Sequence, residues 1–553
     1  MASPEVLKFG SSVLRSAADI PVAMDEIYRR WREGRQVLAI VSAFEGVTDG
    51  LLKEASTLFG SSDPAAIAAY VCVGEKRTAE LLSAALNESG IPSRTLTPEE
   101  IELLAEGSCL ESTPTSVRTS VIQNLWNDFP VLVLPGFYGT NKAGQVVLFG
   151  RGGSDVSAIF LASELRAFCR LLTDVEGVFA ADPATNPAAH RFTQMSWKSA
   201  IDVAGPLIQL KALRLAQIRS QPFDVGRPNE AAHTTVGCEH DHWTPPTEAA
   251  RPLRIALVGC GVVGRGVYER IQCYKDQFKI LHVIVRDTSK HVGVDHLTTD
   301  ISVTMNPAVD IVIVCIGSRT LTYPVIVATA GAGKYVITSN KTVVASSGDK
   351  LLDYSQGEQR RLWYSASVGG ALPVLETLAQ LKTPVIEMRG TINGTCGSVL
   401  QGLGEGQSWN EAVAAAQAAG IAEESPARDL TGRDSADKLV LICGLAFRTW
   451  LQAETIPTSG IDSIEGEYAG YQMVARARQT PSGIEASVRP ERLPPDSFLG
   501  QSRGPENRLE IELSTGEIIR LRGQGAGRWP TAASVLGDLH EVARQIRSFN
   551  SLP

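Results

Sequence analysis

A strand that breaks into a glycine-rich turn constrains this chain more than any other stretch of its sequence. Residues 252–266 read PLRIALVGCGVVGRG, in which an apolar run leads into a GxGxxG turn and a helical pattern follows. The first glycine allows the tight turn, the second lets backbone approach a pyrophosphate, and the third lets helix pack on strand. This order predicts a dinucleotide site bordered by Gly259, Gly261, Val262, Val263 and Gly264. An ordinary glycine-rich turn of an α/β domain is the alternative.

Length and composition exclude several classes of protein. A chain of 553 residues is expected to form at least two domains. It is 44% hydrophobic and 20% charged with a net charge of −8, so a globular protein is expected, without a nucleic-acid or membrane partner. The nine cysteines show no CxxC spacing. We see no signal peptide and no apolar run of ~18 residues, so a cytoplasmic location is expected.

The first half of the chain contains two further turns suited to anions. Lys8 stands in KFGSS (8–12) after a short strand, where backbone amides and one cation could hold a phosphate. FGRGGSD (149–155) places Arg151, Ser154 and Asp155 among glycines, which suits an anion beside a metal-bound phosphate. The residues also allow plain loops, the second with Arg151 paired to Asp155.

Residues 1–237 resemble the catalytic domain of aspartokinase, in the amino acid kinase family. The resemblance lies in the order and spacing of KFGSS (8–12), VSAFEGVTDGLL (41–52), VGE (73–75), GFYGTNKAG…LFGRGGSD (136–155) and TDVEGVFAADP (173–183). It implies an α/β sandwich that transfers a phosphoryl group from ATP to L-aspartate with Mg²⁺.

This resemblance gives the residues of the first half their expected roles. Lys8 would neutralise the transferring phosphoryl group. Glu75 and Arg151 would grip aspartate, Arg151 through the α-carboxylate. Ser154 and Asp155 would stand where substrate and phosphate meet.

The expected nucleotide pocket is lined by Thr173 and Asp174 but departs from the family pattern. Four features of that pattern are replaced in this chain. Ser11 stands in place of its second glycine, Cys72 in place of the serine of SxGE, and Ala184 in place of the arginine after Asp-Pro. Residues 206–211 stand in place of the KVLHPR segment. Lys211 would replace a missing cation, although five places along a helix it would point elsewhere. Active aspartate phosphorylation and a kinase fold kept for assembly both stay open.

A polar segment at 238–251, which contains Pro245-Pro246, predicts a linker between two halves. Within it, His240, Asp241 and His242 are interpreted as solvated residues, because three adjacent side chains on an extended segment cannot all face one metal ion. Enzymes in which an aspartokinase domain of this type is fused to a dehydrogenase carry regulatory ACT modules between the two halves. The segment at 238–251 is too short for such modules. We therefore expect no feedback inhibition by threonine or lysine at such modules.

The second predicted strand of the dinucleotide fold, 281–285, ends at Arg286 with Lys290 nearby. An acid near this point reads a ribose 2′-hydroxyl, whereas an arginine accommodates a 2′-phosphate. Although Asp287 follows Arg286, the two cations favour NADP over NAD.

Two lysines of the second half stand where they could move a proton. A strand at 334–338 leads to Ser339 and Lys341, and a lysine at the carboxyl end of a strand, beside a nicotinamide pocket, is placed to steer a proton. Asp434 and Lys438 are spaced i, i+4 and would share a helix face. Taken singly, these patterns also fit an exposed loop lysine and a surface salt bridge.

Residues 252–545 closely resemble homoserine dehydrogenase. The matching motifs include SNK (339–341), SASVGG (365–370), INGT (392–395), AEESPARDLTGRD (422–434) and GQGAGRWPTA (523–532). The resemblance implies hydride transfer between NADP(H) and the pair aspartate 4-semialdehyde and L-homoserine. By it, Lys341 and Lys438 would handle the proton, Glu423 and Asp434 would bind the amino group, and Asp429 would support them.

The remaining expected residues border the cofactor or an ion. Those near the nicotinamide and substrate are Ser339, Asn393, Gly394 and Thr395, and those that close over the cofactor are Gly525, Ala526 and Gly527. Val368 and Gly370 would offer backbone oxygens to Na⁺ or K⁺. Ser365 replaces the family's glutamate at this loop, which could alter cation binding.

The whole chain resembles the fused aspartokinase–homoserine dehydrogenases of threonine and methionine biosynthesis, without ACT modules. The expected fold class is α/β: a kinase-like sandwich (1–237), a Rossmann NADP-binding domain (252–385), an α+β substrate and dimerisation domain (386–520) and a C-terminal return to the Rossmann domain (521–553). A homo-oligomer, a dimer or tetramer, is expected from the resemblance alone. The alternatives are an inert kinase half and a specialised enzyme pair that acts on an aspartate or homoserine analogue.

Overall fold

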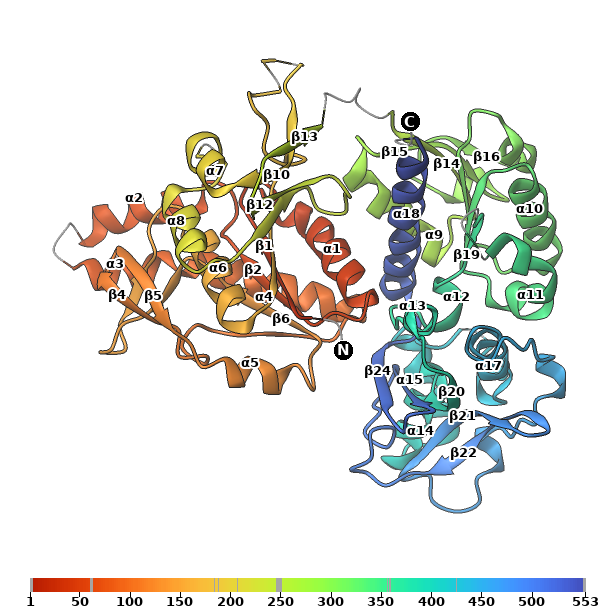
Figure 1. Cartoon of the computed structure of the whole chain (residues 1–553). Coiled ribbons are helices and arrows are strands. Elements are labelled where there is room, and N and C mark those ends of the chain that lie inside the picture. Colours follow the sequence, from red (N-terminus) through yellow and green to blue (C-terminus); the bar gives the residue numbers. More distant parts are fainter. Residues whose placement is uncertain are drawn as a thin grey trace. The chain divides into compact units, whose positions relative to one another are not determined.

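The structure is a computed structural model that describes residues 3–59, 63–183, 185–186, 188–205, 207–244, 251–355, 357, 360–423 and 425–550. The chain divides into two compact units, Met1–Asn87 with Pro92–Ala250, and Glu88–Ile91 with Arg251–Pro553 (Figure 1). Over the described ranges, no helix has both the length and the apolar character needed to cross a bilayer.

The first unit is built on a nine-stranded sheet with the order β13-β10-β12-β11-β9-β1-β2-β6-β3. Its central strands are parallel and buried on both faces, which is why they read as continuous apolar runs. The strands are β1 (Glu5–Phe9), β2 (Val37–Val41), β3 (Ser93–Thr95), β6 (Val131–Pro135), β9 (Phe168–Leu172), β10 (Arg191–Ser196), β11 (Phe223–Gly226), β12 (His233–Cys238) and β13 (His242–Thr244).

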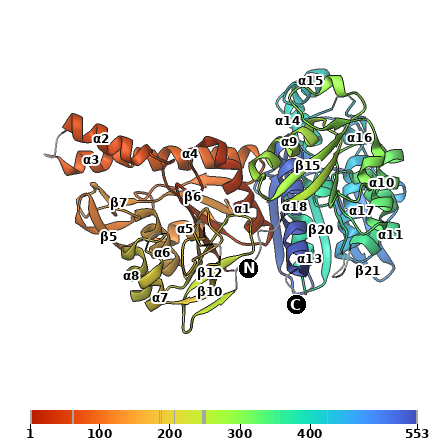
Figure 2. The ribbon, with the colours of Figure 1, turned by 90° about the horizontal axis from the view of Figure 1, so that it is seen from above.

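Helices cover both faces of this sheet, and Figure 2 shows α4 and α8 on opposite sides of it. The helices are α1 (Ile20–Arg32), α2 (Val47–Phe59), α3 (Pro64–Val71), α4 (Val73–Glu88), α5 (Thr119–Leu125), α6 (Gly153–Leu165), α7 (Trp197–Val203) and α8 (Leu210–Ile218). A second sheet of four strands consists of β4 (Leu104–Ser108), β5 (Glu111–Ser116), β7 (Tyr138–Thr140) and β8 (Val146–Leu148). Helix α6 packs on β1, β2 and β9, so its first turn meets the carboxyl end of β1.

The expected linker is wrong over the part that the structure describes. Cys238 ends β12, and β13 pairs antiparallel with β10 as an edge strand of the sheet. Trp243 packs edge-on against Phe192 with ring centroids 5.7 Å apart, while Asp241 accepts hydrogen bonds from the Ser196 N–H and the Ser199 hydroxyl. The segment reads as polar because an edge strand is half exposed. Pro245-Pro246 lies outside the described residues.

The second unit contains a six-stranded parallel sheet with the order β16-β15-β14-β17-β18-β19, the doubly wound arrangement that the GxGxxG turn predicts. Its strands are β14 (Leu253–Val258), β15 (Phe278–Ile284), β16 (Leu297–Thr298), β17 (Ile311–Val314), β18 (Tyr335–Thr338) and β19 (Leu362–Trp363). Its helices are α9 (Val262–Ile271), α10 (Arg319–Gly331), α11 (Lys341–Ser355), α12 (Ala366–Gly369) and the C-terminal α18 (Arg528–Asn550), which packs against α9.

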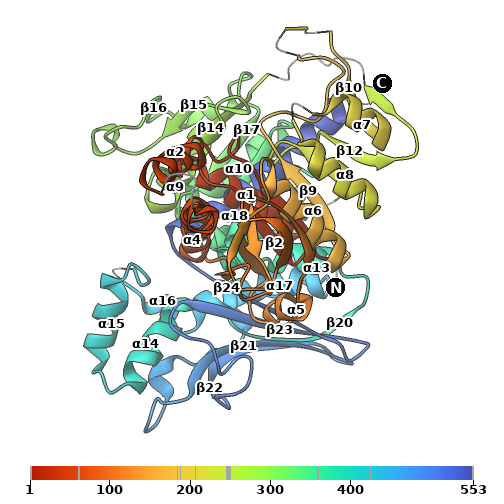
Figure 3. The same ribbon diagram turned by 90° about the vertical axis from the view of Figure 1, so that its left-hand side faces the viewer.

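A five-stranded antiparallel sheet, β22-β21-β20-β23-β24, is inserted between α12 and α18. The strands are β20 (Val385–Thr391), β21 (Tyr471–Thr480), β22 (Gly483–Arg492), β23 (Glu506–Leu513) and β24 (Ile518–Gln524). The accompanying helices are α13 (Val374–Gln380), α14 (Gly394–Gly404), α15 (Trp409–Ala418), α16 (Ala427–Leu430) and α17 (Arg433–Ala446). Helices α14 and α17 cover one face of the sheet (Figure 3).

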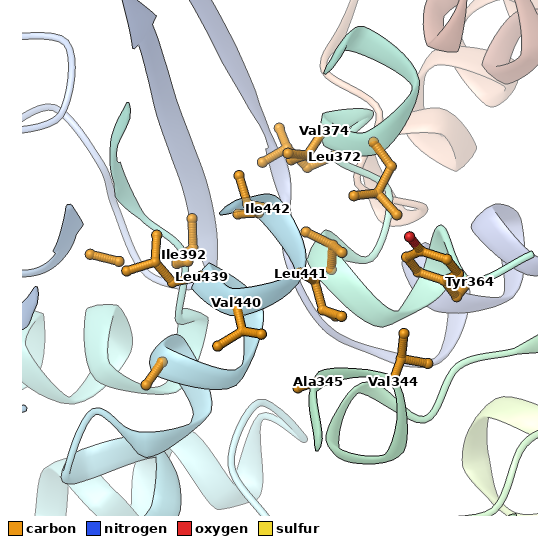
Figure 4. Close-up of a cluster of buried hydrophobic side chains, with 14 of the residues drawn as sticks. Val344, Ala345, Tyr364, Leu372, Val374, Ile392, Leu439, Val440, Leu441 and Ile442 are labelled. Carbon is orange, nitrogen blue, oxygen red and sulfur yellow. The ribbon is translucent and has the colours of Figure 1, made fainter. Parts of the chain in front are cut away.

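Helix α17 is the apolar centre of this second unit. Leu439 to Ile442 are buried in succession, so the helix is surrounded by core on every side, as expected for a helix without an exposed face. Val344 of α11, Leu372 and Ile392 are buried in the same cluster (Figure 4). Each such side chain contributes about 1.5–3 kcal/mol on burial. This packing fixes the first two turns of α17, which carry Asp434 and Lys438.

Candidate active sites

The glycine-rich turn after β14 has the geometry that a pyrophosphate requires. Gly259 adopts a φ of +94°, and a Cβ on Gly264 would overlap the Gly259 carbonyl oxygen, so neither position tolerates a side chain. A Cβ on Gly261 would meet no atom of the described residues within 4 Å, and this glycine caps the N-terminus of α9. Val262 is 71% exposed and Val263 is half-buried in the first turn of that helix. These residues fit a dinucleotide whose phosphates face the helix N-terminus.

Beyond the end of β15, the acid that could read a ribose hydroxyl is engaged in a local turn. The Asp287 carboxylate accepts hydrogen bonds from the Ser289 N–H at 3.0 Å and its hydroxyl at 2.6 Å. Lys290 Nζ lies 3.7 Å from Asp287 Oδ2, and both Arg286 and Lys290 are exposed. The cations at this point are therefore open to solvent, while the carboxylate is partly satisfied within the chain.

A lysine–carboxylate cluster gathers most of the residues expected for catalysis in the second unit. The Asp434 carboxylate, on a residue only 3% exposed, forms ion pairs with Lys341 and, at 3.1 Å, with Lys438. Lys438 Nζ also donates to the Ile392 carbonyl at 2.8 Å. The i, i+4 pair predicted from sequence is confirmed, although it is buried and not the surface salt bridge that spacing alone would suggest.

Asn393 ties this cluster to the turn before α14. Its side-chain amide donates to Asp429 at 2.7 Å and to Asp434 at 3.0 Å, while its oxygen accepts from the Cys396 N–H at 2.8 Å. The last contact caps the N-terminus of α14, so the start of this helix and the buried carboxylate of Asp434 share one side chain as a partner. Thr395 follows in the same turn and donates to the Ile421 carbonyl at 3.2 Å.

The electrostatics of the cluster shift the pKa values of its two aspartates in opposite directions and also shift that of Lys341. Burial disfavours the Asp434 carboxylate, but the two ammonium groups outweigh burial and hold its pKa well below its usual value. Burial also opposes the Lys341 ammonium, but Asp434, Asp429 and Glu423 raise its pKa above the usual value. Burial and the neighbouring Asp434 charge raise the pKa of Asp429. Such divergence within one cluster is typical of acid–base sites.

Exposure separates the two lysines and the carboxylates. The Lys341 side chain is 38% exposed, whereas that of Lys438 is 5% exposed. Glu423 is exposed, and its charge acts on Lys341. Lys341 and Glu423 are thus more exposed to solvent than Lys438 and Asp434.

The glycine loop expected at a monovalent cation touches the glycine loop expected at the cofactor. Gly370 adopts a φ of +56°, a Cβ there would lie 2.7 Å from the Gln524 carbonyl oxygen, and Ala371 donates its N–H to that oxygen at 3.2 Å. Gly525 is buried against Asn507, and Gly527 has a φ of +122° one residue before α18. Val368 is buried in α12, Gly394 opens α14 and Ala526 is half-buried. Ser339 directly follows β18 and donates its N–H to the Val314 carbonyl at 3.3 Å.

In the first unit, the predicted phosphate-binding residues also meet. Lys8 Nζ lies 2.6 Å from Asp155 Oδ1, and the Ser42 hydroxyl donates to Ser154 at 3.0 Å. Asp155 therefore pairs with Lys8 and not with Arg151, which is exposed beside it. This arrangement joins the end of β1 to the first turn of α6.

The residues expected to line the nucleotide pocket and to bind the substrate make contacts of their own. Thr173 donates to Asp174 at 3.1 Å, and its oxygen lies 3.4 Å from the Ser12 hydroxyl. Glu75 is 2% exposed, and one carboxylate oxygen accepts from the Ala43 N–H at 3.3 Å and from Thr48 at 3.4 Å. Burial raises the pKa of Glu75 to about 7.

The departures from the family pattern have distinct outcomes. Cys72 donates its thiol to the Ala69 carbonyl, and burial raises its pKa to about 11, so it is a neutral packing residue. Lys211 pairs with the Glu111 carboxylate and donates to the carbonyl oxygens of Ser112 and Phe149. Ala184 and Pro206 lie outside the described residues. Sequence reasoning missed Ser42 and Glu111; the position of Ser42 at the end of β2 was a usable signal, but nothing in the sequence links Glu111 to Lys211.

These two sites define the class of protein: a nicotinamide-dependent oxidoreductase unit that follows a phosphotransferase-type α/β unit. Comparison with known families identifies the family to which each unit is similar. Residues 4–217 match the amino acid kinase family, residues 259–365 the NAD-binding domain of homoserine dehydrogenase, and residues 373–540 the homoserine dehydrogenase family. The chain belongs to the homoserine dehydrogenase family and carries an amino acid kinase domain ahead of it; it is a fused enzyme of amino-acid biosynthesis.

Individual relatives agree with this assignment. The chain is 30% identical over 320 residues to homoserine dehydrogenase from Pseudomonas aeruginosa, which covers 54% of this chain and 74% of the relative. It is 32% identical over 323 residues to the enzyme from Bacillus subtilis, with the same coverage of 54% and 74%. A solved homoserine dehydrogenase from Thiobacillus denitrificans aligns with a TM-score of 0.50 and 26% identity, over 55% of this chain and 76% of that one.

Proposed function

We propose that the second unit reduces aspartate 4-semialdehyde to L-homoserine with NADPH, and that the first unit phosphorylates L-aspartate with ATP and Mg²⁺. The observation that carries the dehydrogenase proposal is the buried Asp434 carboxylate, held between Lys341 and Lys438. A bound nicotinamide supplies the hydride that the carbonyl carbon accepts. What remains for the protein is to bind the substrate, orient it and deliver one proton to its oxygen.

Lys341 is the proposed proton donor. Reduction of an aldehyde to an alcohol requires one hydride at carbon and one proton at oxygen, and Lys341 combines a protonated ammonium with access to solvent, from which it can be reprotonated. Lys438 is buried and is bound to the Ile392 carbonyl and the Asp434 carboxylate. Its proposed role is to keep Asp434 in place and to supply a positive charge beside it.

The carboxylates are the proposed site for the substrate's amino group. Glu423 is an exposed carboxylate that an ammonium group can approach. A carboxylate has about four acceptor positions; on Asp434, Lys341, Lys438 and Asn393 use three of them, which leaves one for an ammonium hydrogen. Asp429 stays close through Asn393 and sets the orientation of that amide.

NADP is the proposed nicotinamide cofactor because Arg286 and Lys290 are exposed where a 2′-phosphate would lie, while Asp287 is engaged by Ser289. Val368 and Gly370 are proposed to offer backbone oxygens to Na⁺ or K⁺, with support only from the tight turn at Gly370, and no step depends on that ion. A homo-oligomeric state and a cytoplasmic location are proposed on the resemblance alone.

For the kinase unit, the pair of Lys8 and Asp155 carries the proposal, because it places a cation and a carboxylate at the junction of β1 and α6. ATP with Mg²⁺ supplies the phosphoryl group when bound. Lys8 would offset charge on that group, Glu75 would receive the substrate ammonium, and Arg151 would bind the α-carboxylate. Thr173 and Asp174 would border the nucleotide.

The dehydrogenase proposal is tested by homoserine oxidation and aspartate semialdehyde reduction with the wild-type chain and Lys341→Ala. We expect kcat to fall by about 100-fold or more, the range for loss of a general acid–base group, with an unchanged dissociation constant for NADPH. Lys350→Ala, an exposed lysine of the same helix α11, is the matched control and should keep wild-type turnover. Wild-type kcat in Lys341→Ala would contradict the assigned role.

A further inference from the structure

We propose that Lys211 and Glu111 are positioning residues that hold the loop 149–153 in the shape that receives the amino acid substrate. Lys211 would then act on the substrate side of the kinase site and not as a cation for the nucleotide. This inference rests on the proposed kinase function and adds to it a positioning role for two residues that the resemblance did not supply.

The Lys211 ammonium group is fully engaged. Its Nζ pairs with the Glu111 carboxylate and donates to the carbonyl oxygens of Ser112 at 2.8 Å and Phe149 at 2.7 Å. A lysine has three N–H donors, and all of them have acceptors here. No donor remains for a phosphate, so the group serves the protein's own backbone.

One of these acceptors is the first residue of the glycine loop. The Phe149 N–H donates to the Phe137 carbonyl at 2.8 Å, and Lys211 donates to the Phe149 carbonyl, so the peptides on both sides of Phe149, including the one that leads into Gly150, are each held by a hydrogen bond. Gly150 and Gly152 adopt φ values of +77° and +70°, which other residues rarely sustain. The direction of this peptide decides where the loop leads.

Side chains from two separate elements fill the space that the glycines leave open. A Cβ on Gly150 would overlap the Glu111 carboxylate, which comes from β5. A Cβ on Gly152 would overlap the side chain of Gln209, the residue before α8. The loop is thus packed between the small sheet and the start of α8.

The residue between these two glycines is Arg151, the proposed ligand of the substrate carboxylate. Its side chain is exposed, but its backbone is held by the contacts to Gly150 and Gly152. Directly after the loop, Ser154 and Asp155 open α6. Displacement of a binding group by about 1 Å can cost ~10²-fold in rate or affinity. Loss of Lys211 should therefore weaken binding of the amino acid more than binding of ATP.

The test compares Lys211→Met and Lys211→Arg with Lys142→Met in the full-length chain. Lys142 pairs with Glu106 at 2.7 Å in the same small sheet, with side chains 80% and 60% exposed, and does not touch the loop. We expect Lys211→Met to raise the KM for L-aspartate at least ~10-fold with the KM for ATP within about twofold of wild type. Lys211→Arg, which keeps donors at this point, should recover most of that loss, and Lys142→Met should match wild type.

Two further readouts make every outcome decisive. Dehydrogenase activity of the same samples reports folding of the second unit, and hydrogen exchange of the amides of residues 150–155 reports the loop directly. Exchange at least ~10-fold faster in Lys211→Met than in wild type and Lys142→Met supports the proposal even if the wild-type chain lacks kinase turnover, which would contradict only the proposed kinase function. Unchanged exchange with an unchanged aspartate KM, or a rise confined to the KM for ATP, would overturn it.

Discussion

The buried carboxylate of Glu75 makes the stability of the first unit depend on pH. Glu75 is 2% exposed, and within the described part of the chain its second oxygen has no hydrogen-bond partner. Burial raises the pKa from 4.5 to about 7. A raised pKa means that the folded state favours the neutral carboxyl, so this contribution to stability is complete below pH 4.5 and is lost as the pH rises through 7.

The size of the effect follows from the pKa change. At ~1.4 kcal/mol per pKa unit, a rise from 4.5 to about 7 corresponds to about 3 kcal/mol. Glu75→Gln keeps the shape of the side chain without the charge. We therefore expect the free energy of unfolding of Glu75→Gln to exceed that of wild type by up to about 3 kcal/mol at pH 8, which moves its unfolding to a higher urea concentration. Near pH 5 the two proteins should unfold alike.

The assay is urea unfolding of the full-length chains at pH 5, 6.5 and 8, with the transition of the first unit compared between variants. Glu80→Gln, an exposed glutamate on the same helix α4, is the control and should follow wild type at each pH. Parallel pH profiles for wild type and Glu75→Gln would refute the reasoning.

A second consequence concerns binding: an ammonium substrate should ionise Glu75 at pH 6, so calorimetry in two buffers should show proton release that Glu75→Gln lacks.

Three other predictions follow from the second unit and the joint between the halves. Asp434→Asn leaves Lys438, which is 4% exposed, without its counter-charge, so the free energy of unfolding should fall by about 3–5 kcal/mol in urea titrations, and retention of wild-type stability would contradict the bridging role. Arg286→Ser should raise the KM for NADP about 10-fold and leave that for NAD unchanged in steady-state assays; equal effects on both would refute the 2′-phosphate assignment. Threonine titration should leave both activities unchanged, whereas strong inhibition at sub-millimolar concentration would contradict the expectation drawn from the short segment between the halves.

Local patterns predicted much of the fold and part of the sites. The turn at Gly259–Gly264 and the pair of Asp434 and Lys438 depend on residues a few positions apart, whose geometry is set by the turn and the helix themselves. The apolar strand runs likewise predicted a parallel sheet, because buried strands carry no polar alternation.

The features that sequence reasoning missed depend on contacts between distant segments. The pairing of Lys211 with Glu111 joins α8 to β5, and spacing within one segment carries no information about it. The Ile392 carbonyl that receives Lys438 is a backbone group without a sequence signature. The edge strand β13 was mistaken for a linker because half-exposed strands and linkers share a polar composition.

The most direct test of the central claim, that both units are working enzymes, is formation of aspartyl phosphate by the purified full-length chain. ATP, Mg²⁺ and L-aspartate are supplied and the product is trapped as the hydroxamate, with Lys8→Ala as the blank and NADP-dependent homoserine oxidation measured on the same samples. We predict hydroxamate formation in wild type that Lys8→Ala abolishes while homoserine oxidation stays intact. Absence of hydroxamate from a wild-type chain that oxidises homoserine would contradict the account and leave the first unit as a kinase fold kept for assembly.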